Sequence, residues 1–288
     1  MAGLREIQGQ IRSVKNTAKL TNAMKMVASV RLGKLEQKTK EGSKYHDAFE
    51  GLFKRIMNIV GEIDHPLSKD PIGGKHLFIL ITGDKGLCGS YNSNVLKLLA
   101  DRIKELNLQA DDYMVYSIGK KGRSLALYRG VSLLDDYVEN LSSDLPDEDM
   151  KEILGRITDG YISGEWREVE ILYTKYINQS KYLASSSTLL PFRVEESAEQ
   201  ENVDSWIFEP GPDVIAKMLV PVAVKGIVFR SLQESMTCEQ AARMIAMTQA
   251  TDNAKDIEKQ KTKLFNKLRQ EAITSELLDI IGGAEAIN

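Results

Sequence analysis

Cysteine, histidine and proline are scarce in this chain of 288 residues, and each scarcity excludes a class of protein. The two cysteines, Cys88 and Cys238, are far apart and form no CxxC motif. This argues against a disulfide framework and a structural zinc site, and fits a reducing compartment. No two of the histidines, His46, His65 and His76, share a helical turn, so a histidine-based metal site is not expected. The seven prolines leave room for long uninterrupted helices.

The chain also lacks a strong charge of one sign and a long apolar run. Lys and Arg number 38 against 41 Asp and Glu, so the basic surplus of a dedicated nucleic-acid-binding protein is missing. The most apolar stretch, Val214–Phe229, contains Lys217, Lys225 and Pro221 and is shorter than the roughly 20 residues that span a membrane. The N-terminal sequence MAGLREIQGQ has no apolar core of a signal peptide. We therefore expect a soluble protein that reaches a membrane only through its partners.

Motifs for nucleotide binding or catalysis are missing as well. The segment GDKGLCG contains Gly83, Gly86 and Gly89, whose spacing matches neither GxGxxG nor GxxxxGK[ST]. No serine lies in a GxSxG motif. We expect no catalytic residue, no cofactor and no metal in this chain, and we interpret the three glycines as a tight structural turn from a strand to a helix.

Apolar or small residues recur in steps of three and four through the N-terminal region, which is typical of a coiled-coil seam. They are Leu4, Ile7, Ile11, Val14, Ala18, Thr21, Met24, Ala28, Leu32 and Leu35. The spacing predicts a helix that continues to about Ile59 and measures roughly 80 Å at 1.5 Å per residue. Bends or partial breaks are expected at Gly33, Gly42 and Gly51. A helix of this length needs a partner helix to cover its apolar stripe.

A second long helix is predicted at the other end of the chain. It follows an acidic stretch at 195–205 and a short strand at 206–209, begins at Pro212 and ends at Gly282-Gly283. Pro221 is expected to kink this helix near its start. We predict that the two terminal helices pair antiparallel within one chain. Pairing between two copies of the chain is the alternative.

Between these helices, short apolar or β-branched runs alternate with segments of helical periodicity. Strands are predicted at 76–82, 113–118 and 169–177, and helices at 92–106, 120–129 and 147–163. Such alternation predicts a mostly parallel sheet covered by helices. The predicted fold class is therefore α/β plus a long coiled coil, with a central Rossmann-like domain of about five strands. The predicted domains are 1–60 and 210–288 for the coiled-coil helices and 74–209 for the α/β domain.

Charge is divided unevenly along the chain. Residues 1–41 contain nine Lys or Arg against three Glu, whereas residues 131–170 contain twelve Asp or Glu against three Lys or Arg. The basic helix is suited to acidic protein loops, DNA or anionic lipid, and a solvated helix face is the plainer explanation. No aromatic residue precedes Tyr45, so base stacking on single-stranded nucleic acid is not expected.

Three segments, taken in order, carry a resemblance to a known family. They are IRSVKNTAKLTNAMKMVA (11–28), GDKGLCG (83–89), and EQAARMIAMTQATDNA (239–254) with its continuation AITSELLDIIGGAEA (272–286). Together they resemble the gamma subunit of the rotary F-type ATP synthase, and the resemblance covers the chain from end to end. No cysteine pair like that of the chloroplast type lies between Leu190 and Trp206, and no transit peptide is evident, so the resemblance is to the bacterial type.

The resemblance implies a rotor shaft rather than a catalyst. Gamma subunits pair their terminal helices inside a ring of three alpha and three beta subunits, one copy per complex, while the α/β domain contacts epsilon and the membrane c-ring. Ion flow turns the c-ring and the shaft, and the asymmetric shaft couples this rotation to ATP synthesis or hydrolysis in the beta subunits. The implied location is peripheral, on the cytoplasmic face of the bacterial cell membrane.

The resemblance also implies which residues meet partners. Contacts with the beta subunit are implied for Met24, Lys25, Arg243, Gln270, Thr274 and Glu276, and an apolar tip that turns in a sleeve is implied for Leu277, Leu278, Ile280 and Ile281. The methionines Met24, Met26, Met244 and Met247 have a second interpretation, since flexible thioethers also fill helix seams. Two other functions stay open at this point: a homodimeric coiled-coil adaptor and a Rossmann-type nucleotide-dependent enzyme.

Overall fold

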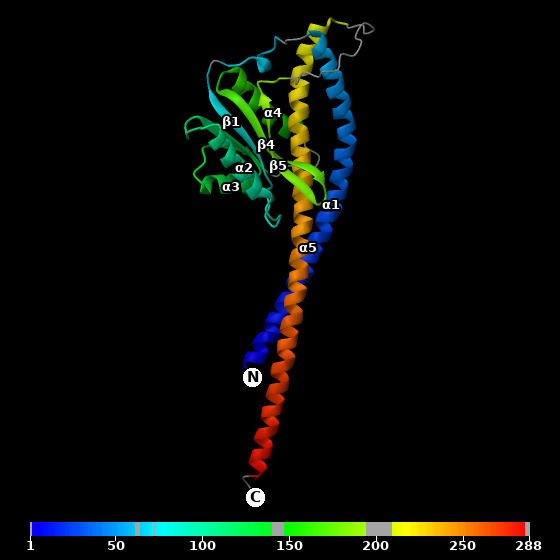
Figure 1. Ribbon diagram of the computed structural model, residues 1–288, viewed down its shortest axis with the longest axis vertical. Helices are drawn as coiled ribbons and strands as arrows, with labels where there is room; N and C mark the ends of the chain where they lie inside the picture. The colour runs from blue at the N-terminus through cyan, green and yellow to red at the C-terminus, as the bar shows by residue number, and fades with distance from the viewer. Residues whose placement is uncertain (1, 61–63, 72, 140–146, 194–208, 286–288) are drawn as a thin grey trace. The chain divides into compact units, whose positions relative to one another are not determined.

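The computed structural model describes residues 2–60, 64–71, 73–139, 147–193 and 209–285. The chain divides into two compact units. Residues 1–29 and 243–288, the two ends of the chain, form the terminal helix pair, and residues 30–242 form the α/β unit. Two long helices contribute to both units: α1 (Ala2–Val60) and α5 (Pro212–Glu285) (Figure 1).

Helix α1 is continuous, as its spacing of apolar residues predicts. The breaks expected at Gly33, Gly42 and Gly51 do not occur. A single glycine inside a helix costs only about 1 kcal/mol, and the neighbouring seam residues Leu32 and Leu35 are almost completely buried. Burial of such leucines contributes about 1.5 to 3 kcal/mol each, which outweighs the glycine penalty.

Helix α5 continues through Pro221 and ends later than expected, and the kink at Pro221 stays a prediction. The predicted stop at Gly282-Gly283 is wrong, because the helix runs on to Glu285. Glycine ends a helix when it takes a left-handed conformation there. In this chain Ala284 and Glu285, which both favour helix, follow the glycine pair and extend α5 by four residues beyond Ile281.

Small side chains bring α1 and α5 together, antiparallel, in the terminal helix pair (Figure 1). The buried residues of this seam are Ala18, Thr21, Ala28, Met247, Thr251 and Ala254. At its centre the Thr251 hydroxyl donates to the Thr21 hydroxyl oxygen at 2.7 Å. Beyond Ala254 none of the described residues of α5 is buried, and the C-terminal end of α5 continues past the N-terminal end of α1 (Figure 1).

The α/β unit is built on one five-stranded sheet. Its strands are β1 (Lys75–Ile81), β2 (Tyr113–Ile118), β3 (Leu133–Val138), β4 (Trp166–Asn178) and β5 (Lys181–Leu190). Their order is β3-β2-β1-β4-β5, and only β5 runs antiparallel to its neighbour. The prediction of a mostly parallel sheet of about five strands is confirmed, although β3 and β5 were not located. Of the strand predicted at 206–209, residues 206–208 lie outside the described residues.

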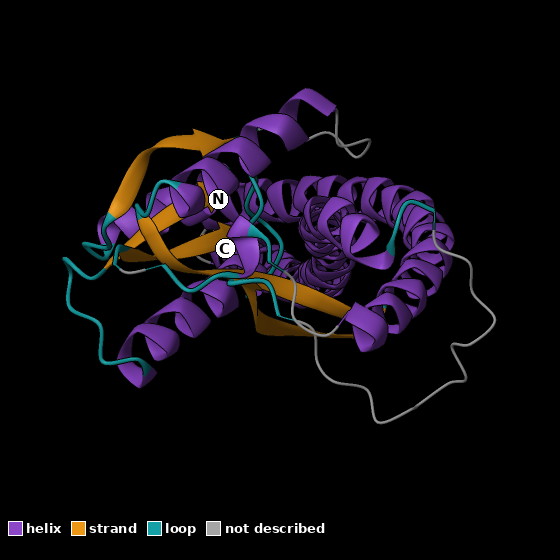
Figure 2. Ribbon diagram, turned by 90° about the horizontal axis from the view of Figure 1, so that it is seen from above, coloured by secondary structure: helices purple, strands orange, loops and turns teal. Residues whose placement is uncertain are grey.

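Helices cover both faces of this sheet (Figure 2). They are α2 (Tyr91–Glu105), α3 (Lys120–Tyr128) and α4 (Asp147–Ile162), with a short 3-10 helix at Pro66–Ser68. On one face α4 and the first part of α5 bury the larger apolar core, in which Trp166 and Ile171 meet Val224. On the other face α2 packs Val95 and Leu99 against the sheet.

Candidate functional site

The beta-contact residues predicted from the sequence lie on both long helices. Met24 and Lys25 are half-buried on α1, and Arg243 is half-buried on α5. All three belong to the terminal helix pair. Part of each of these side chains is therefore covered, and part stays accessible to another molecule.

The other predicted contact residues lie further along α5. Gln270, Thr274 and Glu276 are exposed. The Thr274 hydroxyl donates to the Gln270 backbone carbonyl at 2.9 Å, so these two residues occupy one helix turn. At 1.5 Å per residue they are about 40 Å from Arg243 along the helix axis. The structure thus places the six residues in two separate groups rather than in one site.

The predicted tip is an exposed apolar surface. Leu277, Leu278, Ile280 and Ile281 are 54%, 63%, 68% and 56% exposed. No described residue of α1 lies beside this part of α5. Four large aliphatic side chains exposed within five residues form a cluster that a partner protein can cover.

The glycine turn is a packing feature with two distinct requirements. A Cβ atom on Gly83 would lie 2.7 Å from the Glu239 Oε1 atom, so a larger residue there would require the Glu239 carboxylate to move. Gly89 has a φ of 58°, in the left-handed region that glycine prefers. Gly86 has neither requirement, since the atom nearest to a Cβ added there would be Lys121 Cε at 3.9 Å. Gly83 and Gly89 lie in the connection between β1 and α2, and the role of the three glycines as a tight structural turn stays a prediction.

This turn lies where sheets of this topology usually bind nucleotides. The crevice at the carboxyl ends of neighbouring strands, where the strand order reverses, takes the ligand in doubly wound folds. Here β1 is flanked by β2 and β4, and Gly83 follows β1 directly. In nucleotide-binding proteins, backbone N–H groups at this position donate to a phosphate. In this chain two such N–H groups donate to side chains of the protein instead. Gly83 N donates to Asn92 Oδ1 at 2.9 Å, and Lys120 N donates to Asp84 Oδ1 at 2.9 Å.

Helix α5 adds further groups to this crevice. The Glu239 carboxylate lies beside Gly83, where it would repel a phosphate. Cys238 packs with Cys88, Tyr91 and Ala242 in one small buried cluster. Side chains of α5 therefore lie at this crevice, which the sequence did not reveal, because Glu239 is distant from the glycines in sequence.

Both cysteines are free thiols and buried. Burial, assisted by the Glu234 carboxylate, raises the pKa of the Cys238 thiol far above its ordinary value. A thiol in this state is protonated and unreactive at neutral pH. Among the described residues, no group of His, Cys, Asp and Glu side chains is arranged to hold a metal ion.

These features define a class of protein: two long terminal helices that pair with each other, joined to an α/β unit in which α5 packs beside the turn after the first strand. The chain belongs to the ATP synthase gamma-chain family. The family model described as ATP synthase matches residues 3–287.

Two gamma chains from other organisms align with this chain over its full length. The chain is 33% identical over 294 residues to the ATP synthase gamma chain of Heliobacterium modesticaldum, and 34% identical over 292 residues to that of Polaromonas naphthalenivorans. In both comparisons 100% of each chain is covered.

Solved structures share the fold. A chain from the rotor of Euglena gracilis mitochondrial ATP synthase has a TM-score of 0.69 at 15% identity, covering 94% of this chain and 99% of the other. A chain from the central stalk and c-ring of Tetrahymena thermophila mitochondrial ATP synthase has a TM-score of 0.56 at 23% identity, covering 80% and 99%.

Proposed function

We propose that this chain is the central rotor shaft of an F-type ATP synthase. It couples ion flow through a membrane c-ring to ATP synthesis and hydrolysis in a ring of three alpha and three beta subunits. The observation that carries the proposal is the match to gamma chains along the whole length of both proteins. The chain supplies no active site of its own and acts as a non-catalytic subunit, one copy per complex.

The mechanism follows from the asymmetry of two paired helices. Such a pair has no three-fold axis, so each of three beta subunits meets a different face of it. Contacts that differ between faces stabilise a different conformation in each beta subunit. Rotation moves every beta subunit through these conformations in turn.

Two groups of residues serve as beta contacts in this proposal. Met24, Lys25 and Arg243 form the group on the terminal helix pair, where the two cations suit an acidic loop of beta. Thr274 and Glu276, with Gln270, form the group near the end of α5, where their exposed polar atoms are available for hydrogen bonds. The apolar tip turns in a sleeve of the ring, because non-directional apolar contacts resist rotation little.

The α/β unit contacts epsilon and the c-ring in the same proposal. Among the described helices, none combines the length and apolar character that a membrane span requires. The membership in the gamma-chain family supports a peripheral place in a membrane complex, and we propose that the chain lies on the cytoplasmic face of a bacterial membrane.

Replacement of a resident gamma subunit tests the proposal. The gene for this chain is expressed together with the alpha, beta and epsilon subunits of its own complex in cells without gamma, and rotation of a bead on the shaft is recorded during ATP hydrolysis. Stepwise rotation is expected from these subunits, and ATP-driven ion pumping is expected when the membrane subunits of the complex are expressed with them. Tight ATP or NAD binding by the isolated chain, measured by calorimetry, would contradict the proposal and favour a nucleotide-dependent enzyme.

A further inference from the structure

The β4–β5 hairpin extends past the rest of the sheet. Beyond Leu172, the described residues of β4 pair with β5 alone. The hairpin turns at Gln179-Ser180, where Ser180 N donates to Asn178 Oδ1 at 3.0 Å. We call residues 173–184 the hairpin tip. Its polar groups are directed to two long helices of the α/β unit rather than to another strand.

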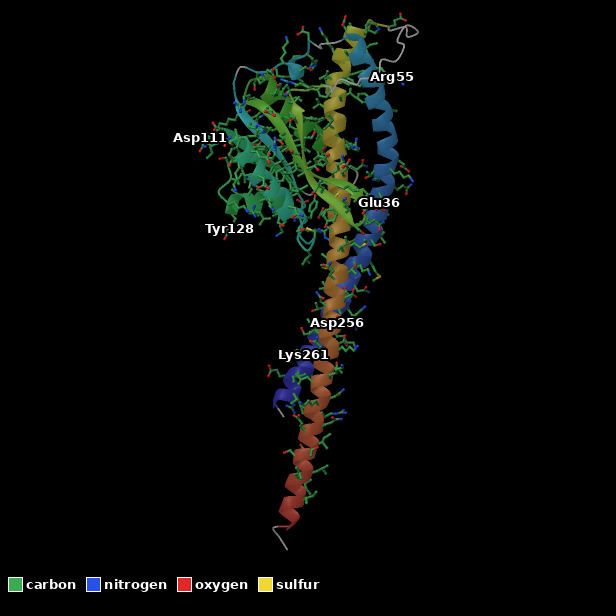
Figure 3. The ribbon with its side chains drawn as sticks, viewed as in Figure 1. Glu36, Arg55, Asp111, Tyr128, Asp256 and Lys261 are labelled. Carbon is green, nitrogen blue, oxygen red and sulfur yellow. The ribbon has the colours of Figure 1, made fainter. Side chains whose placement is uncertain are left out.

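One side of the hairpin tip binds α1 through a single carboxylate. The Tyr176 hydroxyl donates to Glu36 Oε1, and Gln179 Nε2 donates to Glu36 Oε2 at 3.1 Å. Figure 3 shows Glu36 on α1 beside the hairpin. Glu36 is also the first acidic residue after Glu6 in a basic stretch of the sequence. Both carboxylate oxygens are used, and hydrogen bonds to an ionised acceptor are the strong kind.

The backbone of the same hairpin tip binds α5. Tyr176 N donates to Glu234 Oε2 at 3.2 Å, and Thr174 N donates to the Ser235 hydroxyl oxygen at 3.2 Å. Glu234 is 5% exposed and is held in place by Arg230, whose Nε donates to its Oε1 at 2.8 Å. Two backbone N–H groups of β4 therefore donate to side chains of α5.

Tyr176 therefore joins three elements that are distant in sequence. Its hydroxyl reaches α1, its backbone N–H reaches α5, and its ring packs on the cluster that contains Cys88 and Cys238. Apolar seams are non-directional and allow small sliding movements between helices. Directional bonds from one residue to two helices oppose such movements.

We propose that the hairpin tip is a strut that fixes α1 and α5 to the sheet, and that Glu36, Tyr176 and Glu234 set the torsional stiffness with which the α/β unit drives the two helices. This inference rests on the proposed function, because stiffness matters only if the chain transmits torque. The three residues are positioning residues and meet no substrate.

Local opening of the strut is measured by hydrogen exchange on the full-length chain. Tyr176→Phe keeps the ring and removes the bond to Glu36, and we expect the Thr174 and Tyr176 amides to exchange about tenfold faster, which corresponds to about 1.4 kcal/mol. Glu36→Gln keeps an acceptor for the tyrosine and loses that for Gln179, so a smaller increase is expected.

Matched controls come from the same protein. Tyr128→Phe removes the hydroxyl of a tyrosine that is 90% exposed on α3. Glu41→Gln changes an exposed glutamate of α1 whose hydrogen bond is with Gln37 on the same helix. Neither control should alter exchange at the hairpin tip.

Torsional stiffness is measured in the assembled complex from the angular fluctuations of a bead fixed to the rotor. Tyr176→Phe should widen the fluctuations and lower the ions pumped per ATP hydrolysed, while ATP hydrolysis continues. If the unaltered chain neither assembles nor rotates, the proposed function fails. If the unaltered chain rotates, but Tyr176→Phe and Tyr128→Phe give the same angular fluctuations and the same number of ions pumped per ATP, the strut proposal is refuted. A lower midpoint of thermal unfolding in Tyr176→Phe would not rescue it.

Discussion

Glu170 is a buried carboxylate held between three elements of the α/β unit. It lies on β4 and is 1% exposed. Arg102 of α2 donates from Nε to Glu170 Oε1 at 2.8 Å, and His76 Nε2 of β1 lies 3.4 Å from Oε2. Burial alone raises the pKa of the Glu170 carboxyl, but the His76 ring, Arg102 and Ser186 outweigh it and hold the pKa below its ordinary value.

The lowered pKa predicts how stability depends on pH. A carboxyl whose folded pKa is depressed contributes stability above its unfolded pKa and loses it as pH falls through the folded value. We expect Glu170→Gln to cost about 2 kcal/mol at neutral pH, because a charge-assisted hydrogen bond is lost. The difference from the unaltered chain should shrink below pH 4.5, the ordinary value.

Urea unfolding at several pH values measures this difference. The control is Glu105→Gln, which changes a carboxylate 2.7 Å from the same Arg102 but 61% exposed at its side chain. Exposed pairs contribute about 0.2 to 1 kcal/mol, so its effect should be small. A pH-independent difference for Glu170→Gln would refute the assignment of the pKa.

A methyl group at Gly83 tests how closely Glu239 packs at this crevice. Gly83→Ala brings a Cβ to 2.7 Å from Glu239 Oε1, the end of a flexible side chain that can move aside, so we expect a cost at the low end of the roughly 1 to 3 kcal/mol that overpacking causes. The cost should fall in a Glu239→Ala background, which a double-mutant cycle measures by thermal or urea unfolding. Gly86→Ala is the matched control, with no close atom, and should change stability little. Equal costs in both backgrounds would show that Glu239 is not the obstacle.

At the scale of elements, periodic segments were predictable and pairing was not. The seam of α1 and the strand Tyr113–Ile118 follow from local patterns. Strands β3 and β5 were missed, because β3 contains two consecutive aspartates and β5 a run of serines. They are strands through hydrogen bonds to β2 and β4, which are non-local. The bond from Tyr176 to Glu36 could not be predicted for the same reason, since the topology brings the two together.

The C-terminal part of α5 allows a contribution to function to be measured without a change in folding stability. Thr274→Ala with Glu276→Ala alters only exposed side chains, so the free energy of unfolding should change by no more than about 0.5 kcal/mol. Coupled ATP synthesis should fall by about tenfold if the two lost partner contacts contribute about 1.4 kcal/mol together. Synthesis is measured in membrane vesicles that contain the complex.

Thr262→Ala is the matched control for this pair. Thr262 is exposed on α5 and makes the same hydrogen bond as Thr274, to the carbonyl four residues before it, at 2.8 Å. Its replacement should leave synthesis unchanged. Normal synthesis in the double variant would remove Thr274 and Glu276 from the set of beta contacts.

For the whole molecule, the decisive question is whether the helix pair forms within one chain. The hydroxyl oxygens of Thr21 and Thr251 are 2.7 Å apart in the terminal helix pair, and cysteine at both positions should form a disulfide on mild oxidation. Cys88 and Cys238 are buried and should not interfere.

A rotor subunit predicts an intrachain bond, a single-chain mass on non-reducing gels and continued ATP-driven rotation in the complex, because the shaft turns as one body. Each single-cysteine variant should stay uncrosslinked. A homodimeric adaptor instead predicts two crosslinked chains at the mass of a dimer, so the gel distinguishes the two architectures. Only the intrachain pair lets the two distant ends of one sequence act as one shaft.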